Sequence, residues 1–262
     1  MWLSTSCTFK FHISDTTPFL FMIRPRGDLN QHITFEEFII KPNLKITQFQ
    51  DIYGNTYQRF IAPPGKLKVQ SNARIKIHKN YNNAFGKEFI EINSLPENVL
   101  LYLLPSRYCE SDTFNLMASE ITQGLALGYE QVNAITNWIR NNINYEYSSS
   151  YIQVSAIEVN NRKFGVCRDF AHLAIALCRS ISIPSRIVVG YLYKLEPMDL
   201  HAWFEVYIGG AWYRFDATQD DTKEGYVVIA YGRDAADVAV YNQYGATLFP
   251  SSLKVKVKKL KE

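Results

Sequence analysis

The chain has 262 residues, of which 47% are hydrophobic and 20% charged, and this balance is typical of a folded globular protein of one or two domains. The formal net charge is only +3, and no block combines Lys and Arg with interleaved aromatic residues, so we expect no nucleic acid partner. The four cysteines, at positions 7, 109, 167 and 178, show no metal-ligand spacing and are too few for a disulfide framework, so we expect reduced thiols and no metal or other cofactor.

The N-terminal residues have the pattern of a strand. Residues 1–24 lack the early positive charge and unbroken apolar core of a signal peptide. Polar Thr8, Lys10 and His12 instead alternate with apolar neighbours. No window of the chain approaches the roughly 20 apolar residues that a membrane helix needs. We therefore expect no membrane association and a cytoplasmic location.

Short alternating segments continue to about residue 92 and are separated by turn residues. Strands are predicted at residues 35–40, 44–49, 57–61 and 67–77. A Gly54-Asn55 reversal and a Pro63-Pro64-Gly65 breaker separate them. The pattern predicts an antiparallel β-rich domain, which we place at residues 1–104.

The apolar periodicity changes from two to about three and a half after residues 101–112, so we expect a second domain at residues 105–262. Ser111 or Asp112 can cap its first helix. Three apolar stripes at helical spacing predict three helices: Phe114, Met117, Ile121 and Leu125; Val132, Ile135, Ile139 and Ile143 after Gly128; and Phe170, Leu173, Ala174, Leu177 and Ile181, which begin near Cys167 and stop at Pro184. We expect these stripes to form core rather than cofactor contacts.

Strands are predicted after the third helix. They lie at residues 186–195, 202–208 and 212–216, with Gly209-Gly210 as a tight hairpin turn. Basic residues 254–261 alternate with apolar ones, which favours a final strand with one solvated face over a binding tail. The fold class that follows is α+β, with a β-rich N-terminal domain before a core that combines helices with an antiparallel sheet.

Cys167 is the strongest candidate nucleophile. It follows Gly165-Val166 at the first turn of the third predicted helix, where unpaired backbone N–H groups and the helix dipole favour a thiolate. Free cysteines are more often small buried hydrophobes, and we prefer that interpretation for Cys7, Cys109 and Cys178.

His201 and Asp216 are the candidate base and its orienting partner. A thiolate that attacks an acyl carbon needs a base within hydrogen-bond reach, and the base needs an acceptor on its other nitrogen. His201 opens one predicted strand and Asp216 closes the next. With the turn at Gly209-Gly210, antiparallel pairing puts residue 201 across from residue 216 or 218. The imidazole and the carboxylate should therefore lie side by side.

His172 and Asp169 compete for these roles less well. His172 lies five positions after Cys167 on the same predicted helix, which rotates it away from the nucleophile. We expect it to be a packing or hydrogen-bonding residue. Asp169 is too close to the nucleophile in sequence to act as its base, and we expect it to interact with the helix N-terminus.

Four ordered blocks resemble the transglutaminase-like superfamily. They are residues 165–173 (Gly-Val-Cys-Arg-Asp-Phe-Ala-His-Leu), 183–186 (Ile-Pro-Ser-Arg), 199–203 (Asp-Leu-His-Ala-Trp) and 215–218 (Phe-Asp-Ala-Thr). The first half, with its residue 51–55 turn and residues 62–65, is similar to the β-rich N-terminal region of bacterial members. The resemblance implies a papain/transglutaminase-like catalytic domain at residues 105–262. It also implies a catalytic triad of Cys167 as nucleophile, His201 as general base and acid, and Asp216 as the residue that orients His201.

The sequence departs from animal transglutaminases at two points. Those enzymes use a tryptophan shortly before the nucleophile's block as an oxyanion donor, whereas residues 151–155 contain none. Tyr151 could donate in its place, beside the backbone N–H of Cys167. An acidic loop with calcium-ligand spacing is also missing from the sequence. Both departures weaken an assignment to calcium-dependent protein crosslinking.

The function predicted first is hydrolysis of a peptide or amide bond through a cysteine thioester, as in a cysteine peptidase or amidase. A protein-glutamine transglutaminase, in which an amine resolves the thioester, is the main alternative, and a non-catalytic binding module is the third. The expected partner is a peptide or protein substrate. Its identity should depend on pocket loops at residues 193–198 and 226–237. The sequence does not indicate an oligomeric state.

Overall fold

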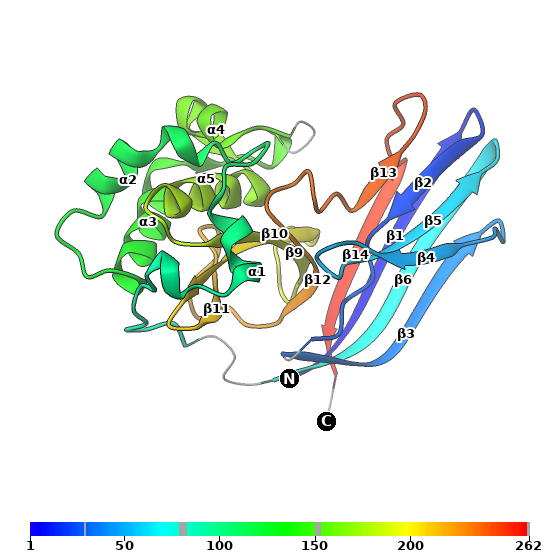
Figure 1. Cartoon of the computed structure of the whole chain (residues 1–262). Helices are drawn as coiled ribbons and strands as arrows, with labels where there is room; N and C mark the ends of the chain where they lie inside the picture. Colours follow the sequence, from blue (N-terminus) through cyan, green and yellow to red (C-terminus); the bar gives the residue numbers. More distant parts are fainter. Residues whose placement is uncertain (29, 79–82, 150–152, 261–262) are drawn as a thin grey trace.

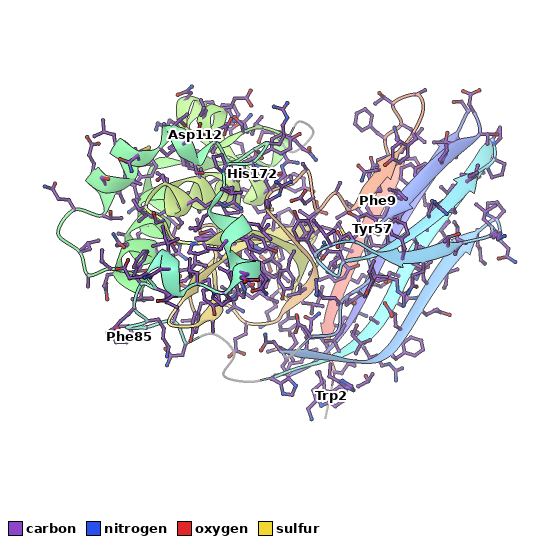
Figure 2. All side chains as sticks on the ribbon, viewed as in Figure 1. Trp2, Phe9, Tyr57, Phe85, Asp112 and His172 are labelled. Atoms are coloured by element: carbon purple, nitrogen blue, oxygen red, sulfur yellow. The ribbon has the colours of Figure 1, made fainter. Side chains whose placement is uncertain are left out.

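The computed structural model describes residues 1–28, 30–78, 83–149 and 153–260. Figure 1 shows an all-strand half beside a half in which helices cover a sheet, so the predicted α+β class is confirmed. In Figure 2, Phe9 and Tyr57 lie in the all-strand half and His172 in the helical half.

The all-strand half consists of two four-stranded antiparallel sheets, with strand orders β14-β1-β6-β3 and β13-β2-β5-β4. Their strands are β1 (Trp2–Ile13), β2 (Thr17–Phe21), β3 (Gln31–Lys41), β4 (Thr47–Gln50), β5 (Thr56–Ala62), β6 (Gly65–Ile77), β13 (Tyr241–Gln243) and β14 (Ser252–Lys259). Alternate residues of β1 and β6 are buried, as the period of two predicts. Phe9 and Phe11 of β1 meet Phe21 of β2 edge-on, at ring centroid distances of 5.6 and 6.1 Å. The two sheets therefore share an aromatic core.

Both ends of the chain build this half. The final strand that the basic residues predicted is β14, and it pairs along β1. Strand β13 pairs with β2. The predicted domain of residues 105–262 stays a prediction, and two of its strands, β13 and β14, complete the N-terminal sheets. No local pattern identifies the partner of a strand, since the partner lies more than 200 residues away.

The helical half surrounds a sheet of order β11-β10-β9-β12. Its strands are β9 (Ser185–Leu192), β10 (Leu200–Ile208), β11 (Ala211–Phe215) and β12 (Tyr226–Gly232). Its helices are α1 (Glu97–Leu100), α2 (Asn115–Ile121), α3 (Tyr129–Asn142), α4 (Ala156–Arg162) and α5 (Cys167–Ser180), with 3-10 turns at Ile92–Ser94, Leu101–Leu103, Ser111–Thr113 and Tyr147–Ser149. A short parallel bridge joins β7 (Asn144–Tyr145) to β8 (Phe164–Gly165).

Most predicted elements of this half are present. The structure adds α1, α4, β7 and β8, which the sequence analysis does not predict, and two predicted segments differ. The first predicted helix is a 3-10 turn followed by α2, which ends at Ile121 before the exposed Leu125. Gly124, with φ of +74°, lies in this break. The second difference is residues 226–232, predicted as part of a pocket loop, which form the buried strand β12.

The N-terminal half supplies the hydrogen bonds that β12 lacks on its outer edge. Val228 exchanges backbone bonds with the buried Gln31 amide, at 2.8 Å in each direction, and its carbonyl also accepts from Arg26 N–H. Asn55 makes the same two-way contact with Tyr231, at 2.7 and 2.9 Å. These hydrogen bonds offset the cost of removing the backbone groups from water. The two halves are therefore joined along β12.

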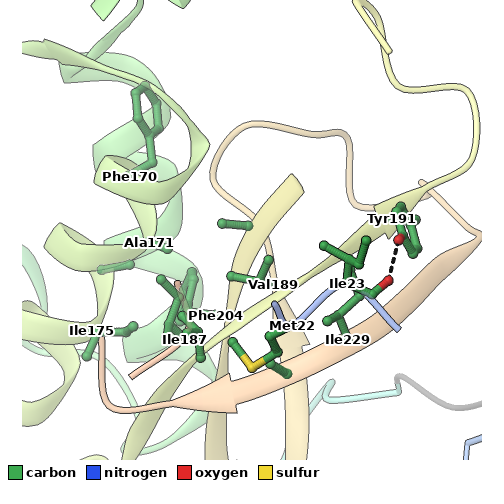
Figure 3. Packing of buried hydrophobic residues seen from close by; sticks show 14 of the residues in the cluster. Met22, Ile23, Phe170, Ala171, Ile175, Ile187, Val189, Tyr191, Phe204 and Ile229 are labelled. Atoms are coloured by element: carbon green, nitrogen blue, oxygen red, sulfur yellow. Dashed lines mark hydrogen bonds between the residues drawn. The ribbon is translucent and has the colours of Figure 1, made fainter. Parts of the chain in front are cut away.

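One hydrophobic cluster continues through both halves. Figure 3 shows Phe170 and Ile175 of α5 at one end of this cluster and Met22 and Ile23 towards the other, with labelled strand residues such as Ile187 between them. The Tyr191 hydroxyl donates to the Ile23 carbonyl at 2.5 Å, inside this cluster. Removing the N-terminal half would expose this apolar surface to water.

Within the described ranges, no helix has the length and apolar character needed to cross a membrane.

Candidate active site

Cys167 is the first residue of α5, as the sequence predicts. The buried Asp169 fixes this helix end, because its Oδ2 accepts the Val166 N–H at 3.1 Å. Arg162 and Arg168 pair with the same carboxylate at 3.1 and 3.0 Å. Burial nevertheless raises the pKa of Asp169 above its ordinary value. The predicted interaction of Asp169 with the helix N-terminus is confirmed, and its role is to hold the turn that carries the thiol.

Glycine is needed just before this turn. A Cβ atom at Gly165 would lie 2.8 Å from the Asp169 Cβ, closer than real Cβ contacts. Gly165 also pairs with Tyr145 in the bridge between β7 and β8. This bridge therefore brings a tyrosine beside the start of α5.

The structure brings His201 and Asp216 together. Strands β10 and β11 pair with Phe204 opposite Phe215, and continuing this register puts His201 opposite Thr218. The His201 Nε2 atom lies 2.7 Å from Asp216 Oδ2. Since Nε2 faces the carboxylate, Nδ1 is the nitrogen left to face Cys167, whose thiol lies near enough to help raise the pKa of the imidazole. The predicted proximity of the three side chains is thus present.

The charge environment favours an imidazolium at this position. Burial alone lowers the pKa of His201, but the charge and hydrogen bond of Asp216 and the contact with Cys167 outweigh burial and raise the pKa to about 10. For Asp216 the opposing effects are burial, which raises the pKa, and the contacts with His201 and Thr218, which lower it, and the net direction is downward. Both shifts stabilise a charged pair.

Two residues that the sequence reasoning missed hold the Asp216 carboxylate. The Thr218 N–H and hydroxyl donate to Oδ1 at 2.9 and 2.8 Å. The Tyr226 hydroxyl donates to Oδ2 at 2.9 Å. An Asp followed two positions later by Thr is a recognisable turn signal for the first contact. No sequence signal indicates the second, because Tyr226 comes from β12, on the far side of β9.

Cys167 opens into a cavity of about 380 Å³. The lining includes His201, the strand residues Val189 and Ala202, and residues of the strap, our name for residues 233–240 between β12 and β13. The sequence predicts two specificity loops, at residues 193–198 and 226–237. Residues 195–197 of the first loop line the cavity. In the second region the strap lines it, whereas strand β12 (Tyr226–Gly232) does not.

Cys167 differs from the other cysteines in its exposure. All four lie in described parts of the chain and are free thiols, and Cys167 is the partly exposed one. Burial raises the pKa of Cys178 to about 12, and it raises the pKa of Cys7 and Cys109 further. The buried three are therefore poor nucleophiles.

His172 has the structural role that the sequence predicts. Its Nδ1 lies 3.0 Å from the Val154 carbonyl, and its Nε2 accepts the Ala235 N–H at 3.2 Å. These contacts require the neutral tautomer with the proton on Nδ1. Its ring stacks on Tyr108 at a centroid distance of 5.3 Å. His172 thereby ties the strap to α5 and to the segment before α4.

This burial predicts a pH effect on stability. Burial lowers the pKa of His172 to about 4, against the pull of Asp234, with Arg168 and Arg179 acting in the same direction as burial. The unfolded chain protonates this imidazole near pH 6.5, so the free energy of unfolding should fall as pH drops from 6.5 to 4, by on the order of 3 kcal/mol. Urea unfolding of the wild type and of His172→Gln across this window measures the effect. Equal slopes with pH in both proteins would contradict it.

The oxyanion donor offered by the sequence, Tyr151, lies outside the described residues. Tyr145 takes a related place, because the bridge to Gly165 brings its hydroxyl close enough to Cys167 for the thiol to affect its pKa. Burial and the Cys167 contact raise the pKa of Tyr145, so it remains a donor. The parallel bridge that positions Tyr145 has only two residues in each strand, too short to recognise in the sequence.

In the described parts of the chain, no group of three or more His, Cys, Asp or Glu side chains is arranged to hold a metal ion.

Comparison with known proteins identifies the family. The family model of the transglutaminase-like superfamily matches residues 116–217. A crystal structure of a candidate cysteine protease from Cytophaga hutchinsonii is 34% identical, covers 100% of this chain and 91% of its own, and superposes with a TM-score of 0.91. The chain belongs to the transglutaminase-like superfamily. An uncharacterised protein of Mycobacterium leprae is 26% identical over 245 residues, which is 86% of each chain. This transglutaminase-like protein therefore shares both of its halves with relatives.

Proposed function

We propose that this transglutaminase-like protein hydrolyses a peptide or amide bond through a thioester on Cys167. The observation that carries the proposal is the partly exposed thiol in contact with His201, whose other nitrogen lies 2.7 Å from Asp216, at the edge of a 380 Å³ cavity. Nucleophile, base and orienting carboxylate in this order are the requirements of acyl transfer.

The geometry assigns a role to each group. The Cys167 sulfur attacks the carbonyl carbon while His201 Nδ1 holds the thiol proton. The Cys167 N–H, at the start of α5, donates to the oxyanion, and the Tyr145 hydroxyl is placed to donate a second hydrogen bond. Collapse breaks the C–N bond and transfers the proton from His201 to the leaving amine. His201 then takes a proton from water, which attacks the thioester and releases the acid and the thiol.

Hydrolysis is favoured over transamidation by the similarity to the Cytophaga hutchinsonii protein, a candidate cysteine protease, over the whole chain. The chemistry up to the thioester is the same for both reactions. The two reactions differ only in whether water or an amine attacks the thioester. The experiment must therefore identify the acyl acceptor.

The test is a competition between the two acceptors. The wild-type protein is incubated with blocked glutamine-containing peptides and a fluorescent primary amine, and products are followed by mass spectrometry. We expect hydrolysed peptide or ammonia with no amine incorporated. Incorporation of the amine at a rate above hydrolysis would make the protein a transglutaminase. If neither product forms and no acyl-Cys167 accumulates with any substrate of a peptide and isopeptide library, the binding-module alternative replaces catalysis.

A further inference from the structure

We infer that the helix side of the cavity is a pocket for one small aliphatic side chain in the acyl part of the substrate. The inference rests on the proposed function and adds a substrate class to it. Its basis is a group of aliphatic residues among those that line the cavity at Cys167.

The polar wall lies on the side of the base. Thr218 and Gln219, which directly follow Asp216, line the cavity there. Because His201 protonates the leaving amine in the proposed reaction, the leaving group belongs on this side. The acyl part, which stays bonded to the Cys167 sulfur, then lies towards α5.

The wall on the α5 side is aliphatic apart from Arg168, which pairs with the buried Asp169. It combines Ile187 and Val189 of β9 and Ala202 of β10 with the strap residues Ala235, Val238, Ala239 and Val240. Ala202 is directly opposite Val189 in the sheet. The strap reaches this wall because Ala235 N–H bonds His172, a residue of α5. These side chains form a continuous surface that offers dispersion contacts and no hydrogen bonds.

The size and charge of the opening limit the occupant. Three of the lining side chains are alanines, and the whole cavity of about 380 Å³ must also hold the scissile amide. A side chain of the size of valine or leucine fits this space better than tryptophan. Glu196, Asp199 and Arg168 also line the cavity, but Arg168 already pairs with Asp169. An acidic side chain would therefore meet two further carboxylates and an aliphatic wall. Aspartate and glutamate should therefore be rejected.

The pocket is preformed by contacts outside it. Asp237 accepts from Tyr53 through its side chain at 2.8 Å and from Tyr57 through its carbonyl at 3.3 Å. The Val240 carbonyl accepts the Met22 N–H at 2.9 Å. The N-terminal half thus holds the strap from one side, while His172 holds it from the other. Substrate binding therefore has to order few protein groups, which keeps the entropic cost of binding low.

Binding to an inactive variant tests the pocket without chemistry. Cys167→Ala protein is titrated calorimetrically with acetyl-Gly-Gly-X-Gly-Gly-amide peptides, in which X is Leu, Val, Ala, Trp or Asp. We expect the Leu or Val peptide to bind about tenfold more tightly than the Ala peptide, and the Asp and Trp peptides to bind more weakly than either. Equal affinity for Leu and Asp, or no binding by any peptide, would overturn the inference.

Two strap variants sharpen the test. Ala239→Phe, added to Cys167→Ala, should fill the pocket and remove the preference for Leu over Ala. Ala236→Phe is the matched control, since Ala236 is exposed on the same strap and does not line the cavity, and it should leave affinities within twofold. If Ala239→Phe keeps the preference for Leu, the pocket is wrong. If the preference holds but the wild type does not hydrolyse the Leu peptide or form a thioester with it, the proposed function fails and the pocket stands.

Discussion

Replacement of Cys167 by alanine should abolish amide hydrolysis, with a fall in kcat on the order of 10⁴-fold or more. The expectation follows from the proposed thioester, because the other three thiols, Cys7, Cys109 and Cys178, are buried. The substitution removes one partly exposed atom at the start of a helix, so the fold should be retained. Activity towards a fluorogenic peptide, with far-UV circular dichroism of both proteins, measures the two quantities.

Cys178→Ala is the matched control for this prediction, because both cysteines lie on α5. The loss of a buried sulfur should lower stability modestly and leave kcat within about threefold. Iodoacetamide labelling at mildly acidic pH gives a second measurement that needs no substrate. Cys167 should be alkylated much faster than Cys178 in the folded wild type, and His201→Ala should slow that reaction. Retained hydrolysis in Cys167→Ala would show that another group is the nucleophile.

The sequence predicts those elements of the structure that depend on residues close together in the chain. The helical stripe that begins at Cys167 and the hairpin at Gly209-Gly210 both depend on neighbours in sequence, and together they put His201 beside Asp216. Strand pairing within one hairpin follows from counting residues. For this reason the sequence predicts the candidate site better than its surroundings.

Contacts between distant segments could not be predicted in the same way. The sequence predicts a loop at residues 226–232, where the structure has a strand. The groups that hydrogen-bond its outer edge, Gln31 and Asn55, come from the other half of the chain. The Tyr226 hydroxyl that reaches Asp216 depends on this pairing. The pairing of β14 with β1 is a contact of the same kind, and the predicted domain boundary contains no information on it. A short sequence window contains no information on such pairings.

Asp216→Asn should lower kcat/KM by about 10²- to 10⁴-fold while keeping the site assembled. The amide occupies the same volume, and its oxygen can still accept from Thr218. It has only one acceptor oxygen, however, whereas the carboxylate accepts on Oδ1 from Thr218 and on Oδ2 from Tyr226 and His201. The negative charge that stabilises the imidazolium is lost as well.

The same substitution should change how stability depends on pH. In the wild type, Asp216 and Cys167 together raise the pKa of His201 to about 10, whereas the unfolded chain releases this proton near pH 6.5. The folded state therefore binds the extra proton between these values, and its contribution to stability is complete below pH 6.5 and is lost as pH rises towards 10. This sign is opposite to that of His172, which acts between pH 4 and 6.5.

Asp216→Asn should bring the pKa of His201 back towards its ordinary value and so flatten the alkaline loss of stability. Urea midpoints at pH 7 and 9.5, with the imidazole titrated by NMR, measure both effects. Tyr226→Phe is the graded control, since it removes one hydrogen bond from the carboxylate and leaves its charge. It should reduce kcat/KM by less than tenfold and keep the alkaline loss of stability. If Asp216→Asn titrates His201 as the wild type does, the carboxylate does not set the charge of this base, and the proposed role of Asp216 is wrong.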